Sequence, residues 1–149
     1  MPILNYTTEI DAGRTVAEIL RILAKAGASQ ARIDYEDGDP TAVMFMLNIG
    51  ARFPTFRLPA NIAGVHRLIA ENKQIKPHMR TRAQATRVAW RIVKDWVEAQ
   101  IAFIESGQAT LPQLFLPHAV GNDGRTLFEQ VAADPRLLLG SGGDPAHND

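Results

Sequence analysis

The sequence contains no cysteine, which excludes disulfide bonds, thiolate metal ligands and cysteine nucleophiles and favours a reducing compartment. No apolar run approaches the ~18 residues that a membrane-spanning helix needs, and the first residues lack the basic and apolar regions of a secretory signal. Glycine and proline number 11 and 9, too few for a low-complexity chain. With 149 residues, of which 46% are hydrophobic, the composition predicts a folded cytoplasmic protein.

Common catalytic and phosphate-binding motifs are also absent. The chain has no Gly-x-x-x-x-Gly-Lys-Ser/Thr loop, no Gly-x-Gly-x-x-Gly and no Gly-x-Ser-x-Gly elbow. The acidic residues around Asp37-Gly38 are typical of a hairpin turn and do not form the loop of an EF-hand. The four histidines lack the spacing of metal ligands; they are His66, His78, His118 and His147. The sequence therefore predicts a protein without catalysis, metal or cofactor.

Charge is distributed unevenly along the chain, although the formal net charge is zero. Residues 66–94 carry eight cations against Glu71 alone, a balance of +7, whereas residues 1–65 carry −1 and residues 95–149 carry −6. A local excess of this size predicts an anion-binding surface. The alternative is that the basic segment pairs with the acidic C-terminal region, in the same chain or in a neighbouring one.

Helix starts are indicated by Thr-x-x-Glu/Gln, the capping box, in which the threonine hydroxyl and the Glu or Gln side chain satisfy backbone N–H groups. Asn61 indicates a further start, and Gly27 and Gly107 are placed to end the first and the longest helix. The predicted helices span residues 16–26, 62–72, 82–106, 111–116 and 127–132. The four boxes are Thr15/Glu18, Thr81/Gln84, Thr110/Gln113 and Thr126/Glu129.

Strands are predicted over residues 31–35, 42–48 and 52–58, and residues 3–10 are a candidate fourth strand. Asp37-Gly38 predicts a hairpin turn between the first two. The middle segment is apolar on both faces, which is typical of a central strand, and Pro54 favours an edge position for the next.

These elements predict an α+β fold: a three- to four-stranded antiparallel sheet with two helices, followed by a long helix and short C-terminal helices. We expect one domain over residues 1–133, with a sheet-and-helix part over 1–79 and a helical part over 80–133. Residues 134–149 are expected to form a tail that is disordered at its end.

The long helix predicts self-association. At 100° per residue, its charged side chains share one arc, and the apolar remainder is about twice as wide as a surface helix of a monomer needs. The sheet can cover one side of it. Either the short C-terminal helices or another subunit must cover the other. We therefore expect a homo-oligomer, with the central helix of a monomer as the alternative.

The same helix carries the candidate site. Trp90 lies at the border of the polar arc, beside arginines, where an aromatic ring can stack on a base while the cations hold phosphates. The alternative is a core tryptophan covered by arginine stems. The candidate ligand-binding residues are Arg57, Lys76, Arg80, Arg82, Arg87, Trp90, Arg91 and Lys94, with Lys73 as a further contributor.

Four stretches, over residues 4–10, 56–59, 88–100 and 115–117, resemble small proteins encoded by bacteriophages and prophages. The longest reads Val88-Ala-Trp-Arg-Ile-Val-Lys-Asp-Trp-Val-Glu-Ala-Gln100. The resemblance spans roughly residues 3–133 and carries no catalytic residue. It implies a phage setting in a bacterial host cell, where small non-enzymatic proteins handle nucleic acid or interfere with host defence.

We therefore expect a non-enzymatic phage-type protein that binds an anionic ligand, single-stranded nucleic acid or a nucleotide, through a basic helix. One alternative is a counter-defence protein that sequesters a cyclic-nucleotide signal or blocks a host defence protein. Another is a structural or assembly component whose apolar helix is the working surface. The expected partners are nucleic acid or a nucleotide, further copies of the chain and, for the counter-defence alternative, a host protein; a membrane is not expected.

Overall fold

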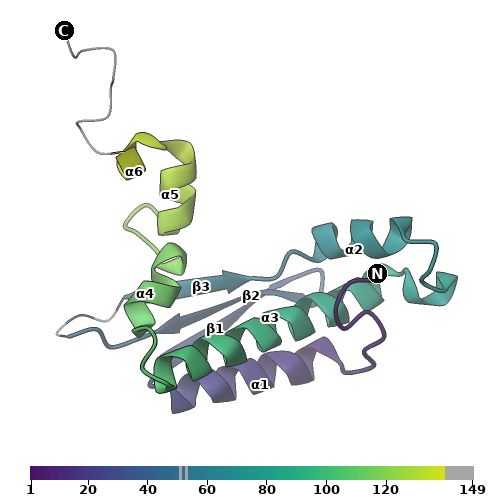
Figure 1. The fold of residues 1–149 in the computed structure, drawn as a ribbon, viewed down its shortest axis with the longest axis horizontal. Helices are drawn as coiled ribbons and strands as arrows, with labels where there is room; N and C mark the ends of the chain where they lie inside the picture. The colour runs from purple at the N-terminus through teal and green to yellow at the C-terminus, as the bar shows by residue number, and fades with distance from the viewer. Residues whose placement is uncertain (51, 53, 140–149) are drawn as a thin grey trace, which may run out of the picture.

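The computed structural model describes residues 1–50, 52 and 54–139. Three strands, β1 (Ser29–Glu36), β2 (Asp39–Met46) and β3 (Thr55–Pro59), form an antiparallel sheet in the order β1-β2-β3. The α+β fold predicted from the sequence is confirmed, including the long helix and the short helices that follow it (Figure 1). The helices are α1 (Ala12–Lys25), α2 (Ile62–Glu71), α3 (Arg82–Glu105), α4 (Leu111–Phe115), α5 (Leu127–Ala133) and α6 (Arg136–Leu139), with 3-10 turns η1 (Pro77–Met79) and η2 (Leu116–His118).

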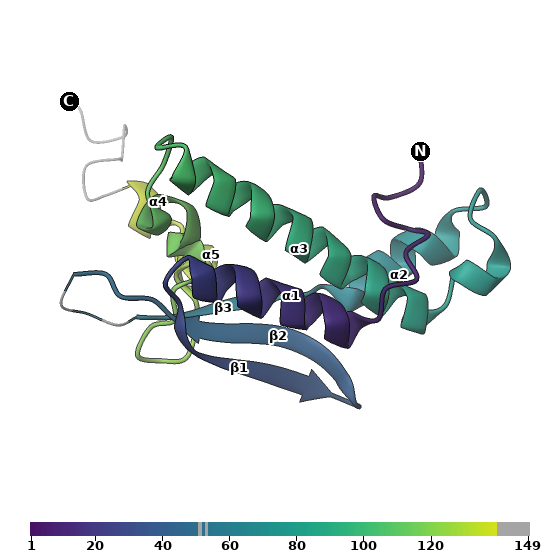
Figure 2. The same ribbon diagram turned by 90° about the horizontal axis from the view of Figure 1, so that it is seen from below.

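One face of the sheet is covered by α1 and α3, which lie side by side (Figure 2). Alternate residues of β2 and β3 point to these helices, as the period of a strand requires. The register places Val43 opposite Leu58 and Phe45 opposite Phe56, and all four are at most 2% exposed. The helices contribute buried residues to the same core: Val16, Ile19, Leu23, Trp90 and Val97.

The hairpin and the strand order agree with the sequence. Asp37 and Gly38 have φ angles of 51° and 83°, the left-handed pair that a two-residue hairpin turn needs. β2 is central, and β3 begins just after Pro54 at the other border of the sheet. The candidate strand over residues 3–10 is wrong: this segment is turn and irregular backbone. The Gln84 Nε2 donates to the carbonyls of Tyr6 and Thr8, each at 2.9 Å, and so ties the segment to α3.

The predicted capping boxes have mixed outcomes. Those of Thr110 and Thr126 are complete, and Asn61 caps α2 by accepting from the Gly64 N–H at 2.9 Å. Thr81 accepts from the Gln84 N–H at 3.1 Å, but the Gln84 side chain is used elsewhere, so that box is half formed. The box at Thr15 is wrong, because α1 already begins at Ala12 and Thr15 is buried within its first turns.

Most of α3 is covered from within the described chain. Besides α1 and the sheet, α2 packs against its N-terminal half in a second core cluster. Near its C-terminal half, Ile92, Val93 and Trp96 are half-buried and line a hollow of about 340 Å³ with Leu58, Pro59 and His118. Self-association through α3 stays a prediction. The second cluster consists of Ile62, Ile69, Ile75, Ala85 and Ala89.

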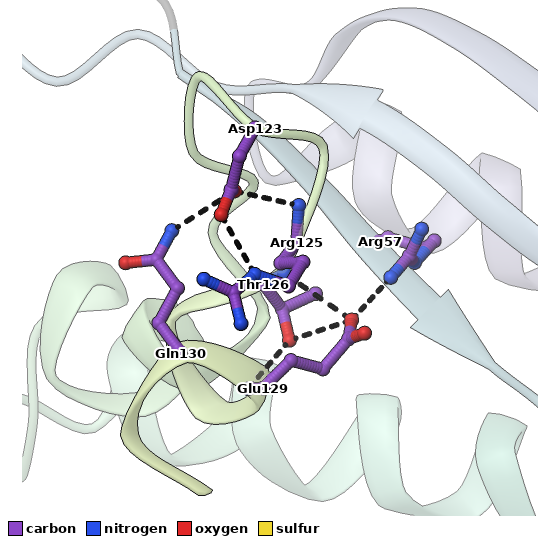
Figure 3. A network of polar contacts seen from close by, with 6 residues as sticks. All are labelled: Arg57, Asp123, Arg125, Thr126, Glu129 and Gln130. Carbon is purple, nitrogen blue, oxygen red and sulfur yellow. Dashed lines mark hydrogen bonds and ion pairs between the residues drawn. The ribbon is translucent and has the colours of Figure 1, made fainter. Parts of the chain in front are cut away.

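The C-terminal segment is fastened to the sheet beside β3. The Val120 N–H donates to the Thr55 carbonyl at 2.8 Å, and Arg57 forms an ion pair with Glu129. Figure 3 shows that the same Glu129 carboxylate accepts from the backbone N–H and the hydroxyl of Thr126, which caps α5. Residues 136–139, expected in the tail, form α6. The predicted disorder concerns residues 140–149, which lie outside the described part of the chain.

His118 lies where the C-terminal segment meets α3 and β3. Its ring is half-buried and lies edge-on to Trp96, with the ring centroids 5.6 Å apart. Burial lowers the pKa of His118 below its ordinary value, against the opposing effect of a hydrogen bond to the backbone of Arg57. Because the folded pKa is depressed, the neutral ring stabilises the fold above the ordinary histidine pKa of about 6.5. This stabilisation is lost as the pH falls below the ordinary histidine pKa and through the lower pKa that His118 has in the folded protein.

We therefore expect the free energy of unfolding to fall between about pH 7.5 and about pH 5.5, the range in which histidine titrates. His118→Gln should flatten this dependence, as measured by urea denaturation at both pH values. His78→Gln is the matched control, because His78 is exposed on η1. An equally steep dependence in His118→Gln would show that another group causes it.

Candidate anion-binding surface

The cations in the middle of α3 are used within the protein. Arg91 reaches Glu18 on α1, with Nη1 and Oε2 2.7 Å apart, and the two side chains are 14% and 26% exposed. This hydrogen bond is the main cause that lowers the pKa of Glu18. Lys94 pairs with Glu98 one turn further along α3, at 2.6 Å. The Arg87 Nε donates to the Gln84 side chain at 3.0 Å. These residues join α1 to α3 and stabilise α3 rather than forming a common surface for a ligand.

Trp90 is not available for stacking on a base. Its side chain is 0% exposed, and its Nε1 donates to the Pro40 carbonyl at 2.9 Å. Assigning it to the ligand-binding site is therefore wrong, and the alternative that it is a core residue is correct. The indole lies in the layer between α3 and the sheet, and its N–H satisfies the Pro40 carbonyl of β2.

Arg57 and Arg80 are also engaged. Arg57 lies on β3 and pairs with Glu129 on α5. The Arg80 Nε donates to the Ile75 carbonyl at 2.7 Å, and its Nη2 reaches the Lys73 carbonyl at 3.4 Å. Arg80 thus closes the loop that precedes η1. The eight candidate residues do not form one site.

A different group of cations lies together at the end of the molecule. We call residues 61–82, which include α2, η1 and the start of α3, the basic lobe. Figures 1 and 2 show that this lobe extends beyond the sheet, at the end where α3 begins. It has five cations against Glu71 alone, a balance of +4. The cations are Arg67, Lys73, Lys76, Arg80 and Arg82, and all except the half-buried Arg80 are exposed.

Among the described residues, none of these five cations forms an ion pair with a carboxylate. The ion pairs of the described chain lie instead on α1, on the sheet, along α3 and in the C-terminal segment. The start of α3 adds the partial positive charge of a helix N-terminus to the same region. Residues 61–82 therefore carry a net charge of +4 that no ion pair of the described residues neutralises.

The lobe holds its cations on an ordered backbone. Ile69 and Ile75 are at most 1% exposed and pack against α3. The Asn72 side chain accepts from the Gln74 N–H at 2.9 Å, and Arg80 bonds two carbonyls of the same loop. Lys73 and Lys76 are thereby presented on the outer side of a loop whose inner side is buried.

The sequence placed Lys76, Arg80 and Arg82 in the site and Lys73 beside it, but Arg67 was missed. Lys73, Lys76, Arg80 and Arg82 have no acidic residue three or four positions away, so the sequence already indicates that they lack a helical ion-pair partner. This signal could not have found Arg67, because Glu71 stands four positions after it. Lys94, in contrast, is followed by Glu98 at the spacing of a helical ion pair.

Comparisons of the chain with protein-family models, with curated proteins and with solved structures found no match. None of the helices that the structure describes is long and apolar enough to cross a bilayer. The described residues also contain no group of three or more His, Asp and Glu side chains placed to hold a metal ion.

Proposed function

We propose that the protein binds nucleic acid without catalysis, and that the basic lobe holds the phosphate backbone. The observation that supports this proposal is the group of five lobe cations without a carboxylate partner among the described residues. Lysine and arginine side chains that neutralise phosphates release condensed counterions, and this release supplies much of the affinity for nucleic acid. Such contacts position a strand without reading its sequence.

The open shape of the lobe favours a polymer over a single nucleotide. Small ligands are usually bound in concave pockets that bury most of their surface. Five hollows among the described residues are lined by the sheet, the start of α1, the middle of α3 and the C-terminal segment, and none of the five includes a residue of the lobe. With Trp90 buried, the expected stacking residue is also lost. We therefore place the interface on the lobe, not on the centre of α3, and expect binding that depends little on sequence.

A counter-defence protein that sequesters a cyclic nucleotide would need its cations to line an enclosed pocket. The lobe cations lie on an outward surface, which favours the nucleic-acid proposal over this alternative. The phage setting stays a prediction from the resemblance of residues 3–133.

The proposal is tested with the triple variant Arg67→Gln, Lys76→Gln and Arg82→Gln. We expect its affinity for a labelled single strand of roughly 20 nucleotides, which exceeds the usual site size, to fall about 10- to 100-fold in fluorescence anisotropy at about 0.1 M salt. The slope of log affinity against log salt should become shallower by about 2, since each lost phosphate contact removes about 0.7. A duplex of the same sequence, measured in parallel, shows which form the lobe prefers.

The matched control removes the same charge from another exposed surface, through Arg14→Gln, Arg21→Gln and Lys25→Gln on α1. Its affinity should stay within about threefold of the unmodified protein, because non-specific attraction by net charge is weak beyond the Debye length of about 10 Å. Equal losses in both triple variants would show that net charge, not the lobe, determines binding, and would contradict the proposal. Circular dichroism of each variant checks that it is folded.

A further inference from the structure

β1 is an edge strand with one unpaired side. It pairs with β2 on one side, and within the described residues no other segment forms backbone hydrogen bonds with its second side. Figure 2 shows β1 along the border of the sheet, on the side away from β3. Alternate residues of such a strand turn their N–H and C=O groups outward, which makes the edge a template for another strand. Tyr35, at the end of β1, is 63% exposed.

The charges of β1 are complementary to those of a second β1. Arg32 and Asp34 lie two residues apart on the face of the sheet opposite the helices, where the Arg32 Nε donates to the Asp34 carboxylate at 3.0 Å and Arg32 also contacts Met44. Because neither side chain of this ion pair is buried, a second copy can add a cross-strand partner to each of them. Between them, Ile33 packs against the core on the helix face. Antiparallel pairing about a two-fold axis at Ile33 would place Arg32 opposite the partner's Asp34, and Asp34 opposite the partner's Arg32. The symmetry makes this favourable cross-strand pair occur twice.

The neighbouring registers are disfavoured by the same charges. In a continuous antiparallel sheet, residues directly opposite each other point to the same face. The two-fold axis can therefore pass through a residue of β1, but not between two residues. An axis at Arg32 would place two Arg32 side chains opposite each other, and an axis at Asp34 would do the same for two carboxylates. Irregularities of pairing at Ser29/Ala31 and Asp34/Tyr35 confine the regular part of β1 to its middle. Charge therefore selects the axis at Ile33.

We propose that the protein forms a symmetric dimer in which β1 pairs antiparallel with β1 of a second copy, about an axis at Ile33. The two sheets then form one continuous sheet, and the helices of both copies cover the same face. An interface made mainly by one strand per copy is smaller than the roughly 1,200–2,000 Å² of stable complexes. The dimer should therefore dissociate reversibly on dilution. This proposal uses a different part of the chain from the basic lobe and does not depend on nucleic-acid binding.

The test is a charge swap, measured by sedimentation over a range of protein concentrations without nucleic acid. Arg32→Asp should lower the association constant at least about tenfold, because Asp would face the partner's Asp34 twice. Asp34→Arg should do the same by placing two pairs of cations together. The double variant Arg32→Asp/Asp34→Arg restores opposite charges in the same register. Its association constant should return to within about threefold of that of the unmodified protein.

These variants should stay folded, because the Arg32 and Asp34 side chains are 68% and 36% exposed; circular dichroism checks this. A protein that stays monomeric at all concentrations would overturn the proposal. So would a dimer that neither single reversal weakens, since its interface would then lie elsewhere, as on α3. Failure of the double variant to recover association would likewise exclude pairing about Ile33.

Discussion

Replacing Trp90 with alanine is expected to lower the free energy of unfolding by about 3–5 kcal/mol, as truncation of large buried aromatics does. Trp90 is 0% exposed and is the largest fully buried side chain described. Its removal leaves a cavity between α3 and the sheet and removes the bond to the Pro40 carbonyl. Since single domains have only about 5–15 kcal/mol in total, chemical denaturation should show a large shift of the midpoint.

Two further variants separate the causes. Trp90→Phe keeps most of the ring volume but leaves the Pro40 carbonyl without its donor, which should cost about 1–3 kcal/mol. Phe103→Ala removes an aromatic ring from the same helix at a site that is 42% exposed and should cost less than about 1 kcal/mol. Trp90→Phe should also bind oligonucleotide as the unmodified protein does. A loss of affinity in a folded Trp90→Phe protein would return the interface to the centre of α3.

Much of the fold follows from local patterns in the sequence. The apolar residues on both faces of β2, the Asp37-Gly38 turn and the apolar width of α3 are each visible in a short stretch of sequence. Those patterns predicted the central strand, the hairpin and a helix that is covered on more than one side. The errors occur where a distant residue decides. Residues 3–10 resemble a strand, but their carbonyls bond to Gln84, which lies at least 76 positions away.

The candidate site illustrates the same limit. The helical spacing of Lys94 and Glu98 is visible in the sequence, so that pair could have been anticipated. The pair between Arg91 and Glu18 could not, because the residues are 73 positions apart and meet only when α1 packs against α3. A helical projection places Trp90 at the border of the polar arc, but it cannot show that the β1–β2 hairpin supplies the Pro40 carbonyl there. The charge count along the sequence identifies residues 66–94 as basic. Which of their cations already have a carboxylate partner depends on how the helices pack, and only the structure shows it.

Phe115→Ala should release the C-terminal segment, at a cost of about 3–5 kcal/mol. Phe115 is 0% exposed, and its ring lies edge-on to Phe45, Phe56 and Trp96, with centroid separations of 6.1, 6.5 and 5.6 Å. The described side chains of α5 and α6 are half-buried or exposed, so Phe115 is the principal apolar anchor of residues 111–139. Without it, that segment should unfold locally before the rest of the chain. Limited trypsin digestion should then cleave at the exposed Arg125 much faster than in the unmodified protein.

Leu116→Ala is the matched control. Leu116 is the next residue in the chain, but its side chain is 51% exposed, so the substitution should change the free energy of unfolding by less than about 0.5 kcal/mol. The second core cluster, between α2 and α3, has no fully buried residue in common with the cluster that holds Phe115, and among the described residues only the half-buried Ala60 packs against both. The basic lobe should therefore keep its shape when the C-terminal segment detaches, and Phe115→Ala should retain its oligonucleotide affinity at temperatures where the body stays folded. Resistance to trypsin in this variant would mean that the Arg57–Glu129 pair and the Val120–Thr55 bond hold the segment without the ring. Loss of oligonucleotide binding together with fast cleavage would instead place part of the nucleic-acid interface on residues 111–139.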